Sequence, residues 1–282
     1  MPSPIGEGIL VYTMADIETR GPKNGTLMIT GGGGLWDEFV ELAGGEGTPI
    51  VAIPTAQDDG SLAEKWGPER VAKEAENNIA ILHTRDRDEA NSEAFVQPIR
   101  EAKAVHLSGG RHWRLADSYL NTLVHEELKN LLARGGVIAG GSAGATIQGS
   151  YMVRGDTAGN HIMMGDHTEG LGFVQNATFD QHLLQRNRHF DLIEVIERYP
   201  HLLGIGLDVD TGIVVRGDEF EVIGKHRVAV YDYTHVLNPD GKFYFLLPGA
   251  KYNMRTREPL LKGNGNDLMD RLEKKAWSEL AG

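Results

Sequence analysis

The fold is indicated most directly by one stretch, residues 135–145, which reads GGVIAGGSAGA. An apolar run of strand length leads straight into the pattern Gly-x-Ser-x-Gly centred on Ser142, and small residues continue after it. A sharp turn between a strand and a helix lifts such a serine hydroxyl out of the sheet, where it can attack a carbonyl carbon. Glycine is needed where a Cβ would collide with a neighbouring strand or helix. The stretch predicts a nucleophilic serine; a purely structural turn is the alternative.

Apolar runs of strand length recur before this stretch. They lie at residues 26–30, 49–54, 79–83 and 103–108, with the fifth at 136–140. Between them apolar side chains fall at helical spacing, as in Trp36, Phe39, Val40 and Ala43. Strand–helix alternation is typical of a parallel sheet with right-handed crossovers and helices on both faces. We therefore expect an α/β fold: a three-layer sandwich around a mostly parallel central sheet.

Three glycine-rich loops follow predicted strands, at residues 30–34, 108–110 and 140–142. The carboxyl ends of parallel strands meet at one edge of the sheet, where such folds bind ligands. We expect the three loops to converge on one site. Residues 31–34 also suggest a phosphate loop and a nucleotide-binding enzyme. That alternative is weak, because no Lys-Ser/Thr follows and the dinucleotide-binding glycine spacing fails at Asp37 and Glu38.

The second half of the chain alternates more strongly between apolar and polar residues. Residues 212–215, 219–223, 227–231 and 242–247 have strand patterns separated by turn signals. We expect antiparallel edge strands that extend the same sheet, within a single domain over residues 1–282 whose core spans about 26–247. Residues 266–279 predict an amphipathic, charged helix packed on the surface.

Composition excludes several functions. The 282 residues include no cysteine, which rules out disulfides, thiolate metal sites and a cysteine nucleophile. A net charge of −12 argues against nucleic acid as a partner and favours approach of a cationic substrate. No segment is apolar for long enough to predict a membrane span. The first eight residues lack the features of a signal peptide, which favours a cytoplasmic location, although a secreted form trimmed of its signal would read alike.

A serine nucleophile needs a base, and histidine has the pKa for that role near neutral pH. Among eleven histidines, His182 stands in a polar cluster, TFDQHLLQRNRH, over residues 178–189. Arg186 and Arg188 in this cluster can grip a carboxylate. The alternative is a helix start capped by Asp180, with both arginines in water. The other histidines are weaker candidates, and no spacing supports a metal site around His161, Asp166 and His167. We expect neither a metal nor another cofactor.

Taken together, the motifs resemble those of the cyanophycinase family, serine peptidases related to the aspartyl dipeptidase peptidase E. The resemblance runs in order over about residues 26–247 and rests on five motifs: the strand-Gly-Gly-Gly at 27–34, VAIPTA at 51–56, Ser-Gly-Gly with Trp-Arg-Leu at 108–115, IAGGSAGA at 138–145, and Asp-Gln-His with two arginines at 180–188. It implies a fold similar to class I glutamine amidotransferases, with serine replacing cysteine at the turn. It also implies cleavage of cyanophycin, a polyaspartate with arginine on its β-carboxyls, and a homodimer.

The resemblance implies a role for each matching residue. Ser142 would be the nucleophile and His182 its general base. The backbone amides of Ala143 and of Gly109 or Gly110 would form the oxyanion hole. The substrate pocket would be lined by Asp180, Gln181, Arg186 and Arg188.

Three positions depart from the family pattern. Asp191 stands where a third arginine is expected, and His112 where a substrate-binding glutamine is expected. Val209 replaces the glutamate that would orient the catalytic histidine, and Asp208 and Asp210 flank it. Strand alternation points these aspartates away from the face of Val209, so either would need a bulge or a one-residue shift to reach His182. Otherwise a backbone carbonyl or a water would orient the histidine, or the site would be catalytically weakened.

The sequence as a whole predicts a cyanophycinase-like serine hydrolase that cleaves aspartyl or β-aspartyl peptide bonds through an acyl-enzyme at Ser142. Its partner would be a peptide or a cyanophycin-like polymer. The alternative is a catalytically weakened relative that binds a peptide or a carboxylate ligand.

Overall fold

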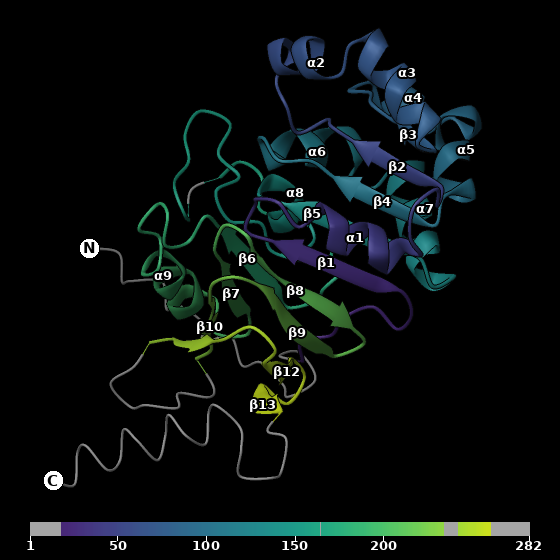
Figure 1. The fold of residues 1–282 in the computed structure, drawn as a ribbon. Helices are drawn as coiled ribbons and strands as arrows, with labels where there is room; N and C mark the ends of the chain where they lie inside the picture. The colour runs from purple at the N-terminus through teal and green to yellow at the C-terminus, as the bar shows by residue number, and fades with distance from the viewer. Residues whose placement is uncertain (1–17, 164, 234–241, 261–282) are drawn as a thin grey trace, which may run out of the picture.

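The computed structural model describes residues 18–163, 165–233 and 242–260, and within these ranges the strands form two sheets (Figure 1). The larger sheet has the order β13-β12-β9-β8-β1-β5-β4-β2-β3. Its strands are β1 (Thr26–Thr30), β2 (Ile50–Ile53), β3 (Ile79–Ile81), β4 (Ala104–Leu107), β5 (Val137–Gly141), β8 (Thr211–Arg216), β9 (Glu219–Gly224), β12 (Lys251–Asn253) and β13 (Glu258–Leu260). The smaller sheet, ordered β11-β10-β7-β6, consists of β6 (Ala177–Gln181), β7 (Leu203–Leu207), β10 (Val228–Tyr231) and β11 (Tyr244–Leu246).

The five strands predicted in the first half pair in parallel, as expected. β1 pairs with β5, β5 with β4, β4 with β2 and β2 with β3. Strands covered on both faces carry continuous apolar runs, which is why these segments are recognisable in the sequence. Parallel pairing brings the ends of β1, β4 and β5 to the same edge, where all three glycine-rich loops begin.

Helices cover both faces of this parallel half (Figure 1). The helices of the described residues are α1 (Trp36–Ala43), α2 (Asp59–Lys65), α3 (Pro68–Glu76), α4 (Arg87–Ala90), α5 (Glu93–Glu101), α6 (His112–Tyr119), α7 (Leu123–Ala133), α8 (Ala143–Thr146) and α9 (Asp191–Arg198), of which α9 packs on the second sheet. Phe39 of α1 packs in one core with Met28 and Ile50. On the opposite face, Leu128 of α7 belongs to a larger core with Leu27. The layered α/β arrangement of this half is confirmed.

The predicted antiparallel edge is correct only in part. β8 pairs antiparallel with β1, and β9 with β8, so residues 212–215 and 219–223 extend the large sheet. The prediction for residues 227–231 and 242–247 is wrong, because β10 pairs with β7 and β11 in the second sheet. Alternation reveals that a strand has one buried face, but it does not specify which strand will lie beside it.

The second sheet positions the second half of the candidate site. Its strands share the large core with the first sheet, through residues such as Phe179 and Ile205. α9 covers its other face with Leu192 and Val195, which pack with Tyr231 of β10. β6 runs parallel to β7, and its end lies beside the turn after β5 (Figure 1). The helix predicted at residues 266–279 lies outside the described residues.

Candidate active site

Ser142 occupies a strained corner between β5 and α8. Its backbone has φ 55° and ψ −113°, a combination that costs a non-glycine residue free energy and is found chiefly at functional sites. Two glycines allow the corner to close. A Cβ on Gly140 would lie 2.1 Å from the carbonyl oxygen of Gly144, and a Cβ on Gly144 would lie 2.1 Å from that of Leu107. The small residues around the serine are therefore required by close backbone packing.

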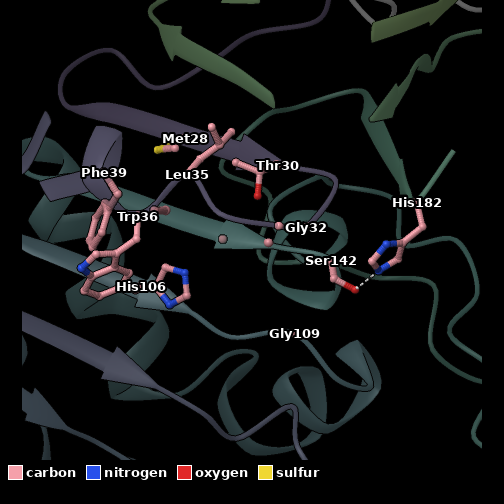
Figure 2. A pocket seen from close by; sticks show the side chains of 14 residues that line it. Met28, Thr30, Gly32, Leu35, Trp36, Phe39, His106, Gly109, Ser142 and His182 are labelled. Carbon is pink, nitrogen blue, oxygen red and sulfur yellow. Dashed lines mark hydrogen bonds between the residues drawn. The ribbon is translucent and has the colours of Figure 1, made fainter. Parts of the chain in front are cut away.

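His182 follows β6 and faces the serine. Its Nε2 lies 2.9 Å from the Ser142 Oγ, a distance suited to proton transfer (Figure 2). Burial lowers the pKa of the half-buried imidazole, and the positive charges of Arg186 and Arg188 lower it further. The ring is therefore neutral at neutral pH, so Nε2 can accept the serine proton. The two groups come from different sheets, 40 residues apart.

Gly32 supports the imidazole from the first glycine-rich loop. A Cβ at this position would lie 2.9 Å from the ring's Cε1, and the residue has φ +111°, which L side chains rarely adopt. Both facts require glycine here. The loop after β1 thus contacts the ring whose Nε2 reaches Ser142. This contact confirms the expected convergence of the loops after β1 and β5.

The two aspartates predicted to orient His182 are engaged elsewhere. Asp208 Oδ1 accepts hydrogen bonds from the backbone amides of Leu184 (3.2 Å) and Gln185 (3.3 Å), in the turn that follows the histidine. Asp210 accepts from the amide of Gly34 at 2.9 Å and pairs with the Lys225 Nζ at 3.1 Å, and these bonds lower its pKa. Neither carboxylate bonds to the imidazole.

The Nδ1 of His182 is buried and makes no hydrogen bond within the described residues. The side chain of Gln185 lies near the ring and partly opposes the lowering of its pKa, but it does not bond to Nδ1. The ring is positioned by Ser142, by Gly32 and by its own backbone, which has φ 55°. Asp208 contacts only the turn that follows the histidine through its carboxylate, within the described residues.

Part of the predicted oxyanion hole lies beside the serine. A Cβ on Gly109 would come 3.3 Å from the Cβ of Ser142 and 3.8 Å from its Oγ. In the described residues the Gly109 amide donates no hydrogen bond, so it is available to an incoming oxygen. Ala143 begins α8 directly after the serine. Gly110 instead packs on Ala56, whose oxygen would lie 2.2 Å from its Cβ.

Three of the predicted substrate-binding residues belong to a buried network of ion pairs and hydrogen bonds: Asp180, Gln181 and Arg188. Asp180 is fully buried and receives two hydrogen bonds from Arg154, both at 2.8 Å. Arg154 also bonds to Asp191 at 2.6 Å. Arg188 donates to the backbone oxygen and to the side chain of Gln181, both at 3.0 Å. Arg154 is not predicted from the sequence, because it lies in an irregular loop without any periodic pattern.

Arg186 and His112 lie in opposite environments. Arg186 is exposed, close to His182, and has no ion-pair partner within the described residues. It is therefore the member of the arginine pair that can meet a substrate carboxylate. His112 is only 2% exposed, and burial lowers its pKa to about 4. It does not line the pocket beside Ser142.

A pocket of about 390 Å³ opens between Ser142 and the start of α1. Figure 2 shows it extending from the Ser142–His182 pair to Trp36, Phe39 and His106. The rings of Trp36 and Phe39 both lie within 5.6 Å of the His106 ring, centroid to centroid. Sequence analysis read the two α1 residues only as a helical apolar face, because spacing does not tell which side chains reach the edge of the sheet.

Comparison with known proteins identifies the family. The family model described as peptidase family S51 matches residues 27–223, and the chain belongs to this family of peptidases. Similar curated proteins include a cyanophycinase from Geminocystis herdmanii, 29% identical over 244 residues that cover 80% of this chain and 90% of that protein. A cyanophycinase from Nostoc sp. is 31% identical over 211 residues, covering 70% of this chain and 68% of its own. The sequence-based assignment to the cyanophycinase and peptidase E family is confirmed.

Solved structures show the same fold. A peptidase from an acI-B1 Actinobacterium superposes with a TM-score of 0.60 at 24% identity, covering 83% of this chain and 98% of that one. A putative peptidase E protein from Listeria monocytogenes gives a TM-score of 0.50 at 18% identity over 72% of this chain and 99% of that one. In the part of the chain that the structure describes, no helix has the length and apolar character needed to cross a membrane.

Proposed function

We propose that the chain is a serine hydrolase that cleaves an aspartyl or β-aspartyl peptide bond through an acyl-enzyme on Ser142. The observation that carries the proposal is the 2.9 Å approach of the Ser142 Oγ to the Nε2 of His182. The strained serine corner lies beside a neutral imidazole and beside Gly109, whose amide has no hydrogen-bond partner among the described residues. A nucleophile, its base and an oxyanion donor are the parts that acyl transfer requires.

In the first step, His182 Nε2 takes the proton of the Ser142 hydroxyl while Oγ bonds to the scissile carbonyl carbon. The Gly109 and Ala143 amides stabilise the negative oxygen of the tetrahedral intermediate. The imidazolium then gives its proton to the departing amine, and the C–N bond breaks to leave an ester on Oγ. Water attacks this ester, His182 accepts the water's proton, and the carboxylic acid is released as Oγ regains a proton.

Arg186 provides the selectivity for an acidic residue. Its guanidinium is exposed near His182 and has no ion-pair partner in the described structure, so it can pair with an aspartyl carboxylate. Asp180 and Arg188 are already engaged within the buried network, so they support the site without lining it. The names of the curated relatives support cyanophycin as the substrate, and a β-aspartyl dipeptide is the alternative.

The test is hydrolysis of purified cyanophycin and of β-Asp-Arg, followed by the appearance of new free amines. Ser142→Ala and His182→Ala should each lower the rate by at least about 10⁴-fold with an unchanged thermal transition. Ser61→Ala, which removes a serine hydroxyl on α2 outside the site, is the matched control and should retain full activity. A serine-directed fluorophosphonate should add its mass at Ser142 in the wild-type and Ser61→Ala proteins but not in Ser142→Ala.

Two results would contradict the proposal in different ways. Labelling of Ser142 without turnover of either substrate would remove the substrate assignment and leave the serine hydrolase. Absence of both labelling and turnover would favour a protein that only holds a peptide or a carboxylate ligand. The physical reason would then be the Nδ1 of His182, which has no hydrogen-bond partner among the described residues.

A further inference from the structure

The walls of the pocket beside Ser142 are mostly apolar. Its side chains are mainly apolar or aromatic, and Met28, Leu35, Trp36 and Phe39 form the part farthest from the serine (Figure 2). Glycine backbone from the loops after β1, β4 and β5 forms much of the rest. Concave, mostly apolar pockets of a few hundred Å³ are the usual form of small-ligand sites.

The pocket lining carries no formal charge. Among the described residues that line it there is no Asp, Glu, Lys or Arg, and its histidines are His106 and His182. Burial lowers the pKa of His106 to about 4, so this ring is neutral at neutral pH. An ionised side chain placed here would lose hydration without gaining a partner, whereas an apolar one would gain from burial.

An adjoining groove makes the approach of acidic ligands to this pocket less favourable. The groove, about 1000 Å³ in volume, shares Trp36 and His106 with the pocket. Five acidic residues line it: Asp37, Glu41, Glu46, Glu74 and Glu76. Their negative potential opposes entry of an aspartyl carboxylate from that side. The carboxylate is directed instead toward Arg186, which lines neither the pocket nor the groove.

We propose that this pocket, lined by Trp36, Phe39 and His106, is a specificity subsite for an uncharged apolar or aromatic side chain. This side chain belongs to the residue that the scissile bond joins to the aspartyl group. The inference rests on the proposed function, because it places that bond at Ser142. It adds a substrate class: aspartyl or β-aspartyl peptides whose second residue is apolar. Trp36 is the residue that determines the preference, since its 39% exposed ring is accessible to a ligand.

The experiment compares β-aspartyl dipeptides whose second residue is Phe, Leu, Gly or Arg. The wild-type kcat/KM for Phe and Leu should exceed that for Gly by about tenfold, and Arg should not exceed Gly. Trp36→Ala should remove most of this preference by lowering kcat/KM for Phe and Leu more than for Gly. Tyr233→Ala deletes an aromatic ring that is more exposed than Trp36 and lines neither pocket nor groove, and it should preserve the preference.

Binding to Ser142→Ala protein, measured by calorimetry with the same dipeptides, gives the ranking independently of turnover. Trp36→Glu is a second variant, and the charge it introduces should reverse the ranking toward Arg. A wild-type preference for Arg would overturn the inference and assign the acidic groove the governing role. An unchanged Phe-to-Gly ratio in Trp36→Ala would overturn it too. Failure of the proposed function looks different, because then Ser142 is not labelled and no dipeptide is hydrolysed.

Discussion

Replacing Gly32 by alanine tests whether the loop after β1 positions the catalytic base. The added Cβ would lie 2.9 Å from the Cε1 of His182, whereas two carbon atoms prefer about 3.5–4.0 Å. The ring or the loop must therefore move by roughly 0.6–1 Å. The Ser142–His182 hydrogen bond has a length of 2.9 Å. A retreat of that size takes it beyond the usual range of about 2.7–3.2 Å.

A misplacement of about 1 Å typically costs on the order of 10²-fold in rate, so Gly32→Ala should lower kcat by about that factor. Its φ of +111° adds strain of about 1–3 kcal/mol, which should lower the thermal midpoint as well. Initial rates and thermal unfolding measure the two effects. Gly34→Ala is the matched control in the same loop, because the nearest atom to its Cβ lies 4.0 Å away. Full activity in Gly32→Ala, with Gly34→Ala indistinguishable from it, would refute the reasoning.

Three further predictions concern the surroundings of the histidine. Asp208→Asn should stay within about tenfold of wild-type activity because its amide oxygen still caps the turn after His182, whereas Asp208→Ala should lower the free energy of unfolding by about 1–3 kcal/mol; a 10⁴-fold rate loss in Asp208→Asn would identify it as an orienting residue after all. The acid limb of the pH profile of kcat/KM should have its midpoint below pH 6.5, since burial lowers the pKa of His182. Arg186→Gln should shift this midpoint to higher pH, because it removes a nearby positive charge. An unshifted midpoint would show that this charge does not affect the pKa of the base. Arg154→Met should lower the free energy of unfolding by about 3–5 kcal/mol in urea titrations, since it leaves buried Asp180 without its bidentate partner, and an unchanged midpoint would contradict the network.

The sequence located the parts of the site whose conformation is local. Strand β1 has the predicted bounds, residues 26–30, and the glycine pattern around Ser142 forms the expected corner. Runs of apolar residues identify strands buried on both faces, and glycines mark close backbone approach, so neighbouring residues carry enough information. The single domain, the dimer and the likeness to glutamine amidotransferases remain predictions.

Contacts between segments far apart in the sequence were harder to predict. The segment at residues 227–231 was recognisable as a strand, but its pairing with β7 depends on residues 203–207 and on the packing of α9. Arg154 gave no signal, because a buried ion pair with Asp180 is visible only when the loop and β6 are brought together. Asp180 and Arg188 matched the motif, but their partners showed that they support the site from inside the protein.

By itself the sequence determined that one serine would stand on a strained turn at the end of a buried parallel strand, and that a polar cluster around His182 was the best source of a base. Only the tertiary structure decided that the two meet, because residues 40 positions apart belong to different sheets whose docking depends on the whole core. It also decided that Asp208 caps a turn and that Trp36 borders a pocket. Local backbone geometry follows from neighbouring residues, whereas the distance between two side chains on separate sheets is set by the packing of everything between them.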